Sequence, residues 1–393
     1  MNNVDKQYLD LCADILHNGV VKDTRSGTVQ SVFGRQLRFN LSDGLPILTT
    51  KKVYTKGIIH ELLWFLKGDT NIKYLVENNV HIWDADAYRY YCEKVKKHNE
   101  ILEYFNEQYR ITKSSAYNVY PWYQHMEIEP MDVFLDNVLK RKSIFLNDKP
   151  YYFEVSKYNY TYGDLGKVYG KQWRAFGNPQ IDQIMDLIEK LKTNPDDRRM
   201  LCVAFNPSDM DEMALPPCHV MFQLYTKPMT EYERLKYANE HNLVDYDTYQ
   251  HLVMEQSKLA TLSHDNGELE IYRKELDGFK IPKRKLSLMW TQRSVDVGLG
   301  LPFNITSYAI LTHIFAKFAN MIPDELICSL GDCHIYFNEF EGIKTQLERK
   351  GFDKLPKLII EGNQSRVEDF KYDDFKIIDY KSEDAIKMPL SVG

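Results

Sequence analysis

The residue best suited to covalent chemistry is Cys218, which follows two prolines at the entrance to an apolar run. Pro216 and Pro217 fix the backbone before it and remove two amide donors. A cysteine positioned in this way can act as a nucleophile whose thiolate is favoured by nearby cations. The alternative is a buried structural cysteine, because free cysteines usually behave as small hydrophobic side chains. The surrounding residues have to decide between these two interpretations.

Four other polar groupings could bind an anion or move a proton. An arginine and a serine beside a glycine-rich turn into a helix suit a phosphate. Adjacent arginines can capture an anion, and a carboxylate inside an apolar helix is costly unless it has a partner, a situation typical of active sites. Taken singly, each grouping also fits a structural role. The four are Gln292–Asp296 with the following Gly298–Asn304, Asp196–Arg199, Glu61, and Gly331–Tyr336.

Apolar periodicity predicts the elements that would position these residues. Ile58–Leu66 and Pro302–Met321 are apolar nearly all round and predict buried helices, and Gln180–Leu191 predicts an amphipathic helix. Helices and strands alternate, so the fold class is α/β or α+β. The strand predictions are Met200–Ala204, His219–Tyr225, Leu286–Trp290 and Glu325–Ser329.

Composition restricts the function classes. The chain has 393 residues and a net charge of −6, whereas a general nucleic-acid coat protein would be basic. Its apolar runs are too short to span a bilayer, and the N-terminus lacks the pattern of a signal peptide, so we expect a cytoplasmic protein. The six cysteines include no CxxC pair, so no zinc site is predicted.

A series of motifs follows in order along the chain: Asp23–Gly27, Leu48–Lys52, Ile59–Trp64, Ile82–Asp84, Gly163–Gly166, Val168–Arg174, Leu215–His219, Gln292–Ser294, Gly300–Asn304 and Gly331–Tyr336. In this order they closely resemble the thymidylate synthase family, which also includes the pyrimidine deoxynucleotide hydroxymethylases of bacteriophages. The resemblance covers 1–87, 163–226 and 284–393. It implies one catalytic domain over 1–393 with a mixed β-sheet flanked by helices, interrupted by family-atypical insertions at 88–162 and 227–283.

The resemblance implies a covalent mechanism. In this family a cysteine thiolate adds to carbon 6 of deoxyuridylate (dUMP), which makes carbon 5 nucleophilic enough to take a one-carbon unit from 5,10-methylenetetrahydrofolate. Cys218 matches that nucleophile. Arg293 would favour its thiolate and bind the phosphate together with Ser294 and Arg25. The two remaining phosphate ligands reach across from the partner subunit of a homodimer, and they match Arg198 and Arg199.

Further matches assign the base, the sugar and the protons. Asn304 matches the residue that reads the base, and its carboxamide suits uracil because it can both accept and donate. An aspartate there would suit cytosine. The proton-handling residues match Glu61 and Tyr169, the sugar contacts match His334 and Tyr336, and the remaining substrate-side positions are Gln292, His219 and Asp296.

The folate side is implied by the same resemblance. Lys51 matches a residue of the track that binds the polyglutamate chain, and no metal is implied. The residues that match the folate pocket are Ile82, Trp83, Asp296, Leu299, Gly300 and Phe303.

Both branches of the family form the same intermediate, a methylene group on carbon 5. A synthase reduces it by hydride transfer, whereas a hydroxymethylase lets water add, so exclusion of water decides the product. Departures from the usual synthase pattern fall on the folate side, at Tyr54, Lys167 and Glu339, and the C-terminal Lys387–Gly393 runs one residue longer. We therefore favour a deoxyuridylate hydroxymethylase encoded by a bacteriophage. The alternative is a thymidylate synthase, with which the retained Trp83 and Leu215 agree.

The insertions leave a further alternative. Residues 88–162 hold 13 of the 27 tyrosines, together with several lysines. Such residues can stack on single-stranded nucleic acid, but large amphipathic side chains more often pack a subdomain or an interface. We expect packing, and no nucleic-acid or membrane partner. The 227–283 insertion is predicted to be helical.

Overall fold

The computed structural model describes residues 1–112, 125–151, 154–261 and 266–389, which form two compact units. The first unit contains Met1–Val53, Gln183–Val203 and the chain from Cys218 onward, and the second contains Tyr54–Asp182 and Ala204–Pro217. The stretch 88–162 lies in the second unit and 227–283 in the first. A single catalytic domain with two insertions stays a prediction.

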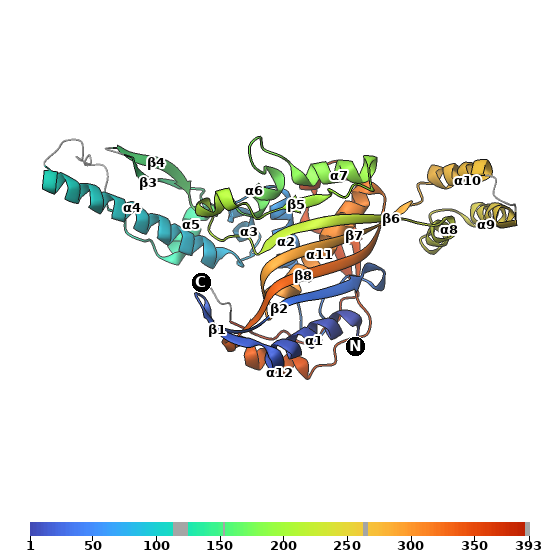
Figure 1. Cartoon of the computed structure of the whole chain (residues 1–393), viewed down its shortest axis with the longest axis horizontal. Coiled ribbons are helices and arrows are strands. Elements are labelled where there is room, and N and C mark those ends of the chain that lie inside the picture. Colours follow the sequence, from blue (N-terminus) through green and yellow to red (C-terminus); the bar gives the residue numbers. More distant parts are fainter. Residues whose placement is uncertain (113–124, 152–153, 262–265, 390–393) are drawn as a thin grey trace. The chain divides into compact units, whose positions relative to one another are not determined.

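A six-stranded mixed sheet is the frame of the first unit (Figure 1). Strands β7 and β8 pair in parallel, with Asp296 opposite His334, and all other neighbours in this sheet pair antiparallel. The carboxyl ends of β7 and β8 therefore meet at one end of the sheet, where β6 begins. The strands in spatial order are β1 (Val20–Thr24), β2 (Gly27–Asn40), β8 (Ile322–Tyr336), β7 (Arg284–Asp296), β6 (His219–Pro228) and β5 (Leu201–Val203).

Helix α11 (Gly300–Ala319) packs on β7 and β8 and is buried along most of its length. Pro302 suits its first turn, and Asn320 ends it in the left-handed conformation at a φ of 49°. Helix α11 also contacts α7 (Gln183–Thr193), whereas α1 (Asn3–Asn18) packs on β2 and α12 (Phe340–Leu347) on α1. A separate antiparallel pair consists of β9 (Lys357–Ile360) and β10 (Phe375–Ile378).

The 227–283 stretch contains three helices with a small core of their own. They are α8 (Glu231–Glu240), α9 (Tyr246–Thr261) and α10 (Asn266–Gly278). Helix α8 begins with a capping box between Thr230 and Glu233. The buried residues of this core are Leu235, Ala238, Leu252, Tyr272, Leu276 and Ile281.

The second unit is mainly helical, and several of its described tyrosines pack together. The rings of Tyr91 and Tyr162 each lie within 6 Å of Phe134, and Tyr90 and Tyr160 are also buried. These described tyrosines therefore form a hydrophobic core. The elements are α2 (Thr55–Leu66), α3 (Lys73–Glu77), α4 (Asp84–Thr112), α5 (Met131–Leu139), β3 (Ser143–Tyr151), β4 (Glu154–Thr161) and α6 (Tyr169–Arg174). Strands β3 and β4 form an antiparallel pair, and β3 contacts α4.

The sequence predicts the helices better than the strand lengths. The buried helices expected at Ile58–Leu66 and Pro302–Met321 are confirmed as α2 and α11, and the amphipathic helix as α7. Strands β7 and β8 are far longer than the runs Leu286–Trp290 and Glu325–Ser329. Polar residues at their carboxyl ends break the apolar pattern there.

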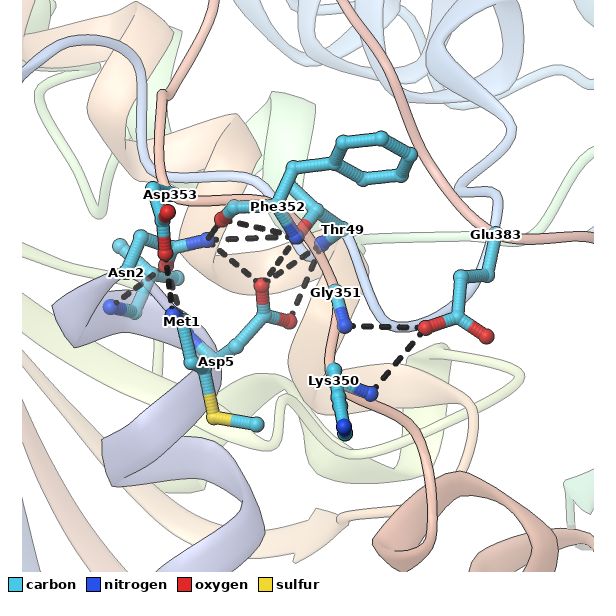
Figure 2. A network of polar contacts seen from close by, with 10 residues as sticks. Met1, Asn2, Asp5, Thr49, Lys350, Gly351, Phe352, Asp353 and Glu383 are labelled. Carbon is cyan, nitrogen blue, oxygen red and sulfur yellow. Dashed lines mark hydrogen bonds and ion pairs between the residues drawn. The ribbon is translucent and has the colours of Figure 1, made fainter.

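A buried aspartate fixes the loop that carries Lys51 (Figure 2). Asp5 is fully buried and accepts hydrogen bonds from the backbone amides and hydroxyls of Thr49 and Thr50, and from the Asn2 amide. Hydrogen bonds to a charged group contribute about 1.5–3 kcal/mol each. The Glu383 amide donates to the Thr49 carbonyl oxygen over 2.9 Å. The N-terminus and the chain near the C-terminus thus hold one loop.

Candidate active site

Cys218 lies directly before β6 and next to Arg293 of β7. The Arg293 amide donates to the Cys218 carbonyl oxygen over 2.9 Å, and the Arg293 Nη2 lies 3.8 Å from the Cys218 Sγ. Gly331 of β8 permits this packing, because a Cβ there would lie 2.6 Å from the Arg293 carbonyl oxygen. A guanidinium beside sulfur favours the thiolate. The predicted nucleophile and one predicted phosphate ligand are therefore in contact.

The predicted base reader, Asn304, is oriented by neighbouring polar groups. Its Nδ2 donates to the Oε1 of the buried Gln292 over 3.2 Å. Asn304 also hydrogen-bonds His219, whose pKa is lowered to about 4 by burial. The ring of His219 is therefore neutral near pH 7. A fixed carboxamide in the first turn of α11 is suited to select a base by its hydrogen-bonding edge.

Two aromatic residues that the sequence did not single out support this cluster. The rings of Trp290 and Tyr308 stack with centroids 4.7 Å apart. The Trp290 Nε1 donates to the Gln292 Oε1, and the Tyr308 hydroxyl lies 3.2 Å from the His219 Nδ1. Both rings are buried, and the sequence places them only within a predicted strand and a predicted buried helix. Only their spacing from Gln292 and Asn304 could have indicated a second role.

The predicted sugar and phosphate residues lie at the ends of β8 and β7 and in the β1–β2 turn. The rings of His334 and Tyr336 are perpendicular with centroids 5.2 Å apart. Ser26 hydrogen-bonds Tyr336, which brings the turn containing the exposed Arg25 to the end of β8. Ser294 pairs with Asp332 in the parallel register. Polar side chains thus gather at one end of the sheet.

Arg198 and Arg199 precede β5, and both side chains are exposed. The Arg199 amide donates to Asp197, which turns the chain before the strand. Two exposed cations before an edge strand are available to a molecule outside the first unit. Their assignment to a neighbouring subunit's site stays a prediction.

The predicted folate residues of the first unit form one turn between β7 and α11. Asp296 accepts from the Leu299 amide over 2.9 Å, and Leu299 and Phe303 are half-exposed. A half-buried carboxylate acceptor beside partly exposed apolar side chains suits a heterocycle with N–H donors and an aromatic tail. Lys51, by contrast, is only 6% exposed, and its ammonium donates to the Gly298 carbonyl oxygen. Its role in a polyglutamate track stays a prediction.

The second unit brings Glu61, Trp83 and Tyr169 together. The Trp83 Nε1 donates to the Glu61 Oε1 over 2.7 Å, and the Trp83 and Tyr169 rings lie 6.3 Å apart. Burial raises the pKa of Glu61 to about 7, although the bond from Trp83 lowers it. This shift corresponds to about 3 kcal/mol in favour of the protonated form. Such a carboxyl group can exchange protons near neutral pH. The predicted folate contact Ile82 is adjacent and half-buried.

Lys167 and Tyr54, which depart from the usual synthase pattern, form ion pairs and a hydrogen bond with nearby residues of the second unit. The Lys167 ammonium lies 3.0 Å from Asp209 and 3.1 Å from Glu212, and the Tyr54 hydroxyl donates to the Asn79 carbonyl oxygen. The last residues of the tail, including Gly393, lie outside the described residues. Over the described ranges, no group of three or more His, Cys, Asp or Glu side chains could hold a metal, and no helix is long and apolar enough to cross a membrane.

The contact between Arg293 and Cys218 predicts a reactive thiol. We expect Arg293→Gln to slow alkylation of Cys218 by iodoacetamide at neutral pH by roughly tenfold, because the sulfur loses its cationic neighbour. Mass spectrometry of the Cys218 peptide measures this rate, with the Cys92 peptide of the second unit as an internal reference. Arg38→Gln on β2 is the matched control. Equal rates for Arg293→Gln and the native protein would contradict the assigned contact.

Comparisons with known proteins identify the family of the chain. A family model described as "Thymidylate synthase" matches residues 6–282 and 278–392. A thymidylate synthase of Listeria monocytogenes is 37% identical over 391 residues, which cover 98% of this chain and all of the relative. Those of Mycoplasma mobile and Staphylococcus haemolyticus are 38% and 37% identical and are also covered completely. The chain therefore belongs to the thymidylate synthase family.

Proposed function

We propose that this protein is a thymidylate synthase, which methylates dUMP to dTMP and releases dihydrofolate. The relatives that align over their whole length all carry the name thymidylate synthase. This supports the alternative of the sequence analysis over the hydroxymethylase that was placed first. The departures on the folate side are compatible with either product.

The observation that carries the proposal is the Cys218 thiol beside the Arg293 guanidinium. The thiolate adds to carbon 6 of the uracil ring, and the electron pair of the ring's double bond moves to carbon 5 and the carbonyl group. Arg293 favours the thiolate and, with Ser294 and Arg25, binds the phosphate of the nucleotide. A net charge of −6 is no obstacle, since Arg25 and Arg293 give the proposed phosphate site a local positive charge.

Base choice and proton transfer are proposed for two further residues. Asn304, fixed by Gln292 and His219, accepts from the ring N–H of uracil and donates to an exocyclic carbonyl oxygen of the base. A neutral His219 adds no cation beside the base. Glu61, with a pKa raised to about 7 by burial, supplies and takes protons at carbon 5 and the carbonyl group through water.

The co-substrate 5,10-methylenetetrahydrofolate supplies the one-carbon unit and then the hydride. In the first unit, the residues proposed to hold it are Asp296 at the end of β7, Leu299 in the following turn and Phe303 in the first turn of α11. Asp296 offers a half-buried acceptor, and the half-exposed Leu299 and Phe303 offer apolar surface. Their task is to orient the co-substrate and to exclude water until the hydride is transferred.

A product assay tests the proposal. On incubation with dUMP and methylenetetrahydrofolate, we expect dihydrofolate and dTMP in equal amounts, followed by absorbance and by nucleotide chromatography. Cys218→Ser, which keeps the binding residues, is expected to abolish turnover while retaining nucleotide binding. Release of 5-hydroxymethyl-dUMP without dihydrofolate would instead support the hydroxymethylase.

We also propose that the enzyme is a homodimer in which Arg198 and Arg199 complete the phosphate site of the partner subunit. One face of the sheet supports this. In register across four strands, Leu201, Gln223, Met289 and Ile327 form a row that is half-exposed or exposed, whereas the adjacent row, which includes Phe222 and Trp290, is buried. A largely apolar, uncovered row at the centre of a sheet is typical of an interface.

Mixing inactive variants tests the dimer. We expect Cys218→Ser and Arg199→Ala, each impaired alone, to regain activity when they are mixed under conditions that exchange subunits. One site of the mixed dimer then combines an intact cysteine with an intact arginine. Cys218→Ser mixed with Arg293→Ala is the control, because both residues come from the same subunit and no intact site forms. Equal recovery in the two mixtures, or none in either, would argue against a shared site.

A further inference from the structure

Glu339 is a buried carboxyl group that the proposed reaction does not use. It ends the short 3-10 helix Phe337–Glu339 directly after β8, and its side chain is fully buried. The Oε2 accepts from the Tyr336 amide over 3.1 Å, whereas the buried Oε1 receives no donor from the described residues. An ionised carboxylate in this place would leave a charged oxygen without compensation, which is costly.

The second carboxyl group of the pair is Asp296, at the end of β7. Asp296 is close enough to Glu339 to raise its pKa through the neighbouring charge and through hydrogen bonding. Two carboxyl groups can form a hydrogen bond only when one of them carries a proton. Burial raises the pKa of Asp296 as well, but the Leu299 and Gly298 amides and the neighbouring His334 and Lys51 act to lower it, so Asp296 is the better placed of the two to carry the negative charge. Burial and the neighbouring Asp296 raise the pKa of Glu339 to about 8, so Glu339 is the member that holds the proton.

The backbone between the two acids is built for their close approach. A Cβ on Gly298 would lie only 2.6 Å from the Glu339 Oε2, so the position has no room for a side chain. The Gly298 carbonyl oxygen accepts from the buried Lys51 ammonium on its other side. When the two acids share one proton, the positive charge of Lys51 balances the single negative charge, which is on Asp296. Loss of that proton would leave a net negative charge in a buried cluster.

The tyrosine and cysteine on α1 that face the pair add no charge to this cluster near pH 7. The Tyr8 hydroxyl donates to the Val297 carbonyl oxygen, and burial holds its pKa well above the usual value. Burial raises the pKa of Cys12 to about 12. Both groups are therefore neutral near pH 7. The set facing Asp296 and Glu339 consists of Tyr8 and Cys12 on α1, Lys51 on the loop before α2, and His334 and Tyr336 on β8.

We propose that Glu339 is a positioning residue: it stays protonated, donates to Asp296, and thereby holds the turn between β7 and α11 in the shape that binds folate. The identity of the ligand rests on the proposed function, whereas the shared proton does not. Because this turn contains Asp296 and Leu299, loss of the proton is expected to weaken binding of the co-substrate rather than the chemical step. Folate affinity should then fall at alkaline pH.

The first test detects the proton on Glu339 from the pH dependence of the melting temperature and needs no assay of activity. The native protein keeps a proton on Glu339 that the unfolded chain releases near its ordinary pKa of about 4.3. The stabilisation is therefore complete below that pH and is lost as the pH rises through about 8. We expect the melting temperature of the native protein to fall relative to that of Glu339→Gln between about pH 5 and about pH 9. Parallel curves for the two proteins would overturn the shared proton.

A matched control uses the exposed Glu348 at the end of α12. Glu348→Gln removes a carboxylate in the same region but no buried contact, and its melting curve is expected to keep the pH dependence of the native protein. If Glu348→Gln instead behaved like Glu339→Gln, the effect would be one of general surface charge and the proposal would fail.

The second test measures the KM for methylenetetrahydrofolate against pH. In the native enzyme the KM is expected to rise at alkaline pH, and in Glu339→Gln this dependence is expected to disappear, because the amide donates to Asp296 at every pH. Glu339→Leu, which cannot donate, is expected to raise the KM several-fold at every pH with a smaller change in kcat. Equal pH dependence of the KM in the native enzyme and Glu339→Gln would overturn the positioning role. If no product forms from dUMP, the proposed function is wrong. The comparison of melting temperatures still tests the proton on Glu339 in that case.

Discussion

Strands β7 and β8 run side by side in the same direction, and this pairing determines where the polar residues of the first unit gather. The register places Ser294 opposite Asp332 and Asp296 opposite His334 at the carboxyl ends of the two strands. Strand β6 runs the other way, so its first residue lies beside Gln292, and Cys218 is brought to Arg293. Helix α11 buries the pair from one side. The positions of the proposed nucleophile Cys218 and of the proposed phosphate ligands Arg293 and Ser294 thus depend on one parallel contact between strands that are distant in sequence from Cys218.

Burial sets the charge states around this frame. Glu61 in the second unit and Glu339 in the first have pKa values raised to about 7 and about 8, in both cases chiefly by desolvation. His219 has its pKa lowered to about 4 for the same reason. Near neutral pH the buried acids can therefore hold protons while the imidazole stays neutral. Arg25 and Arg293 give a protein with a net negative charge a local cationic site for an anionic substrate.

The sequence predicts a segment of the fold or of the candidate site well only where the apolar residues of that segment follow a regular period. The helix α11 and the position of Cys218 before β6 follow from apolar periodicity and from two prolines. The full lengths of β7 and β8 do not, because Arg293, Ser294 and Asp296 interrupt the apolar alternation where the strands end. The stack of Trp290 on Tyr308 was not predicted, since a buried aromatic pair has the same sequence pattern whether or not it orients polar neighbours. Methylation and hydroxymethylation differ in the exclusion of water, which no single residue type encodes.

The central claim is that Cys218 bonds covalently to carbon 6 of the base while the one-carbon unit is attached at carbon 5. Trapping with 5-fluoro-dUMP tests it most directly, because fluorine at carbon 5 cannot leave as a proton and the covalent complex accumulates. In the presence of methylenetetrahydrofolate, mass spectrometry should find nucleotide and folate attached to the peptide that contains Cys218, and Cys218→Ser should give no adduct. An adduct on another residue, or none with the native protein despite bound nucleotide, would contradict the account.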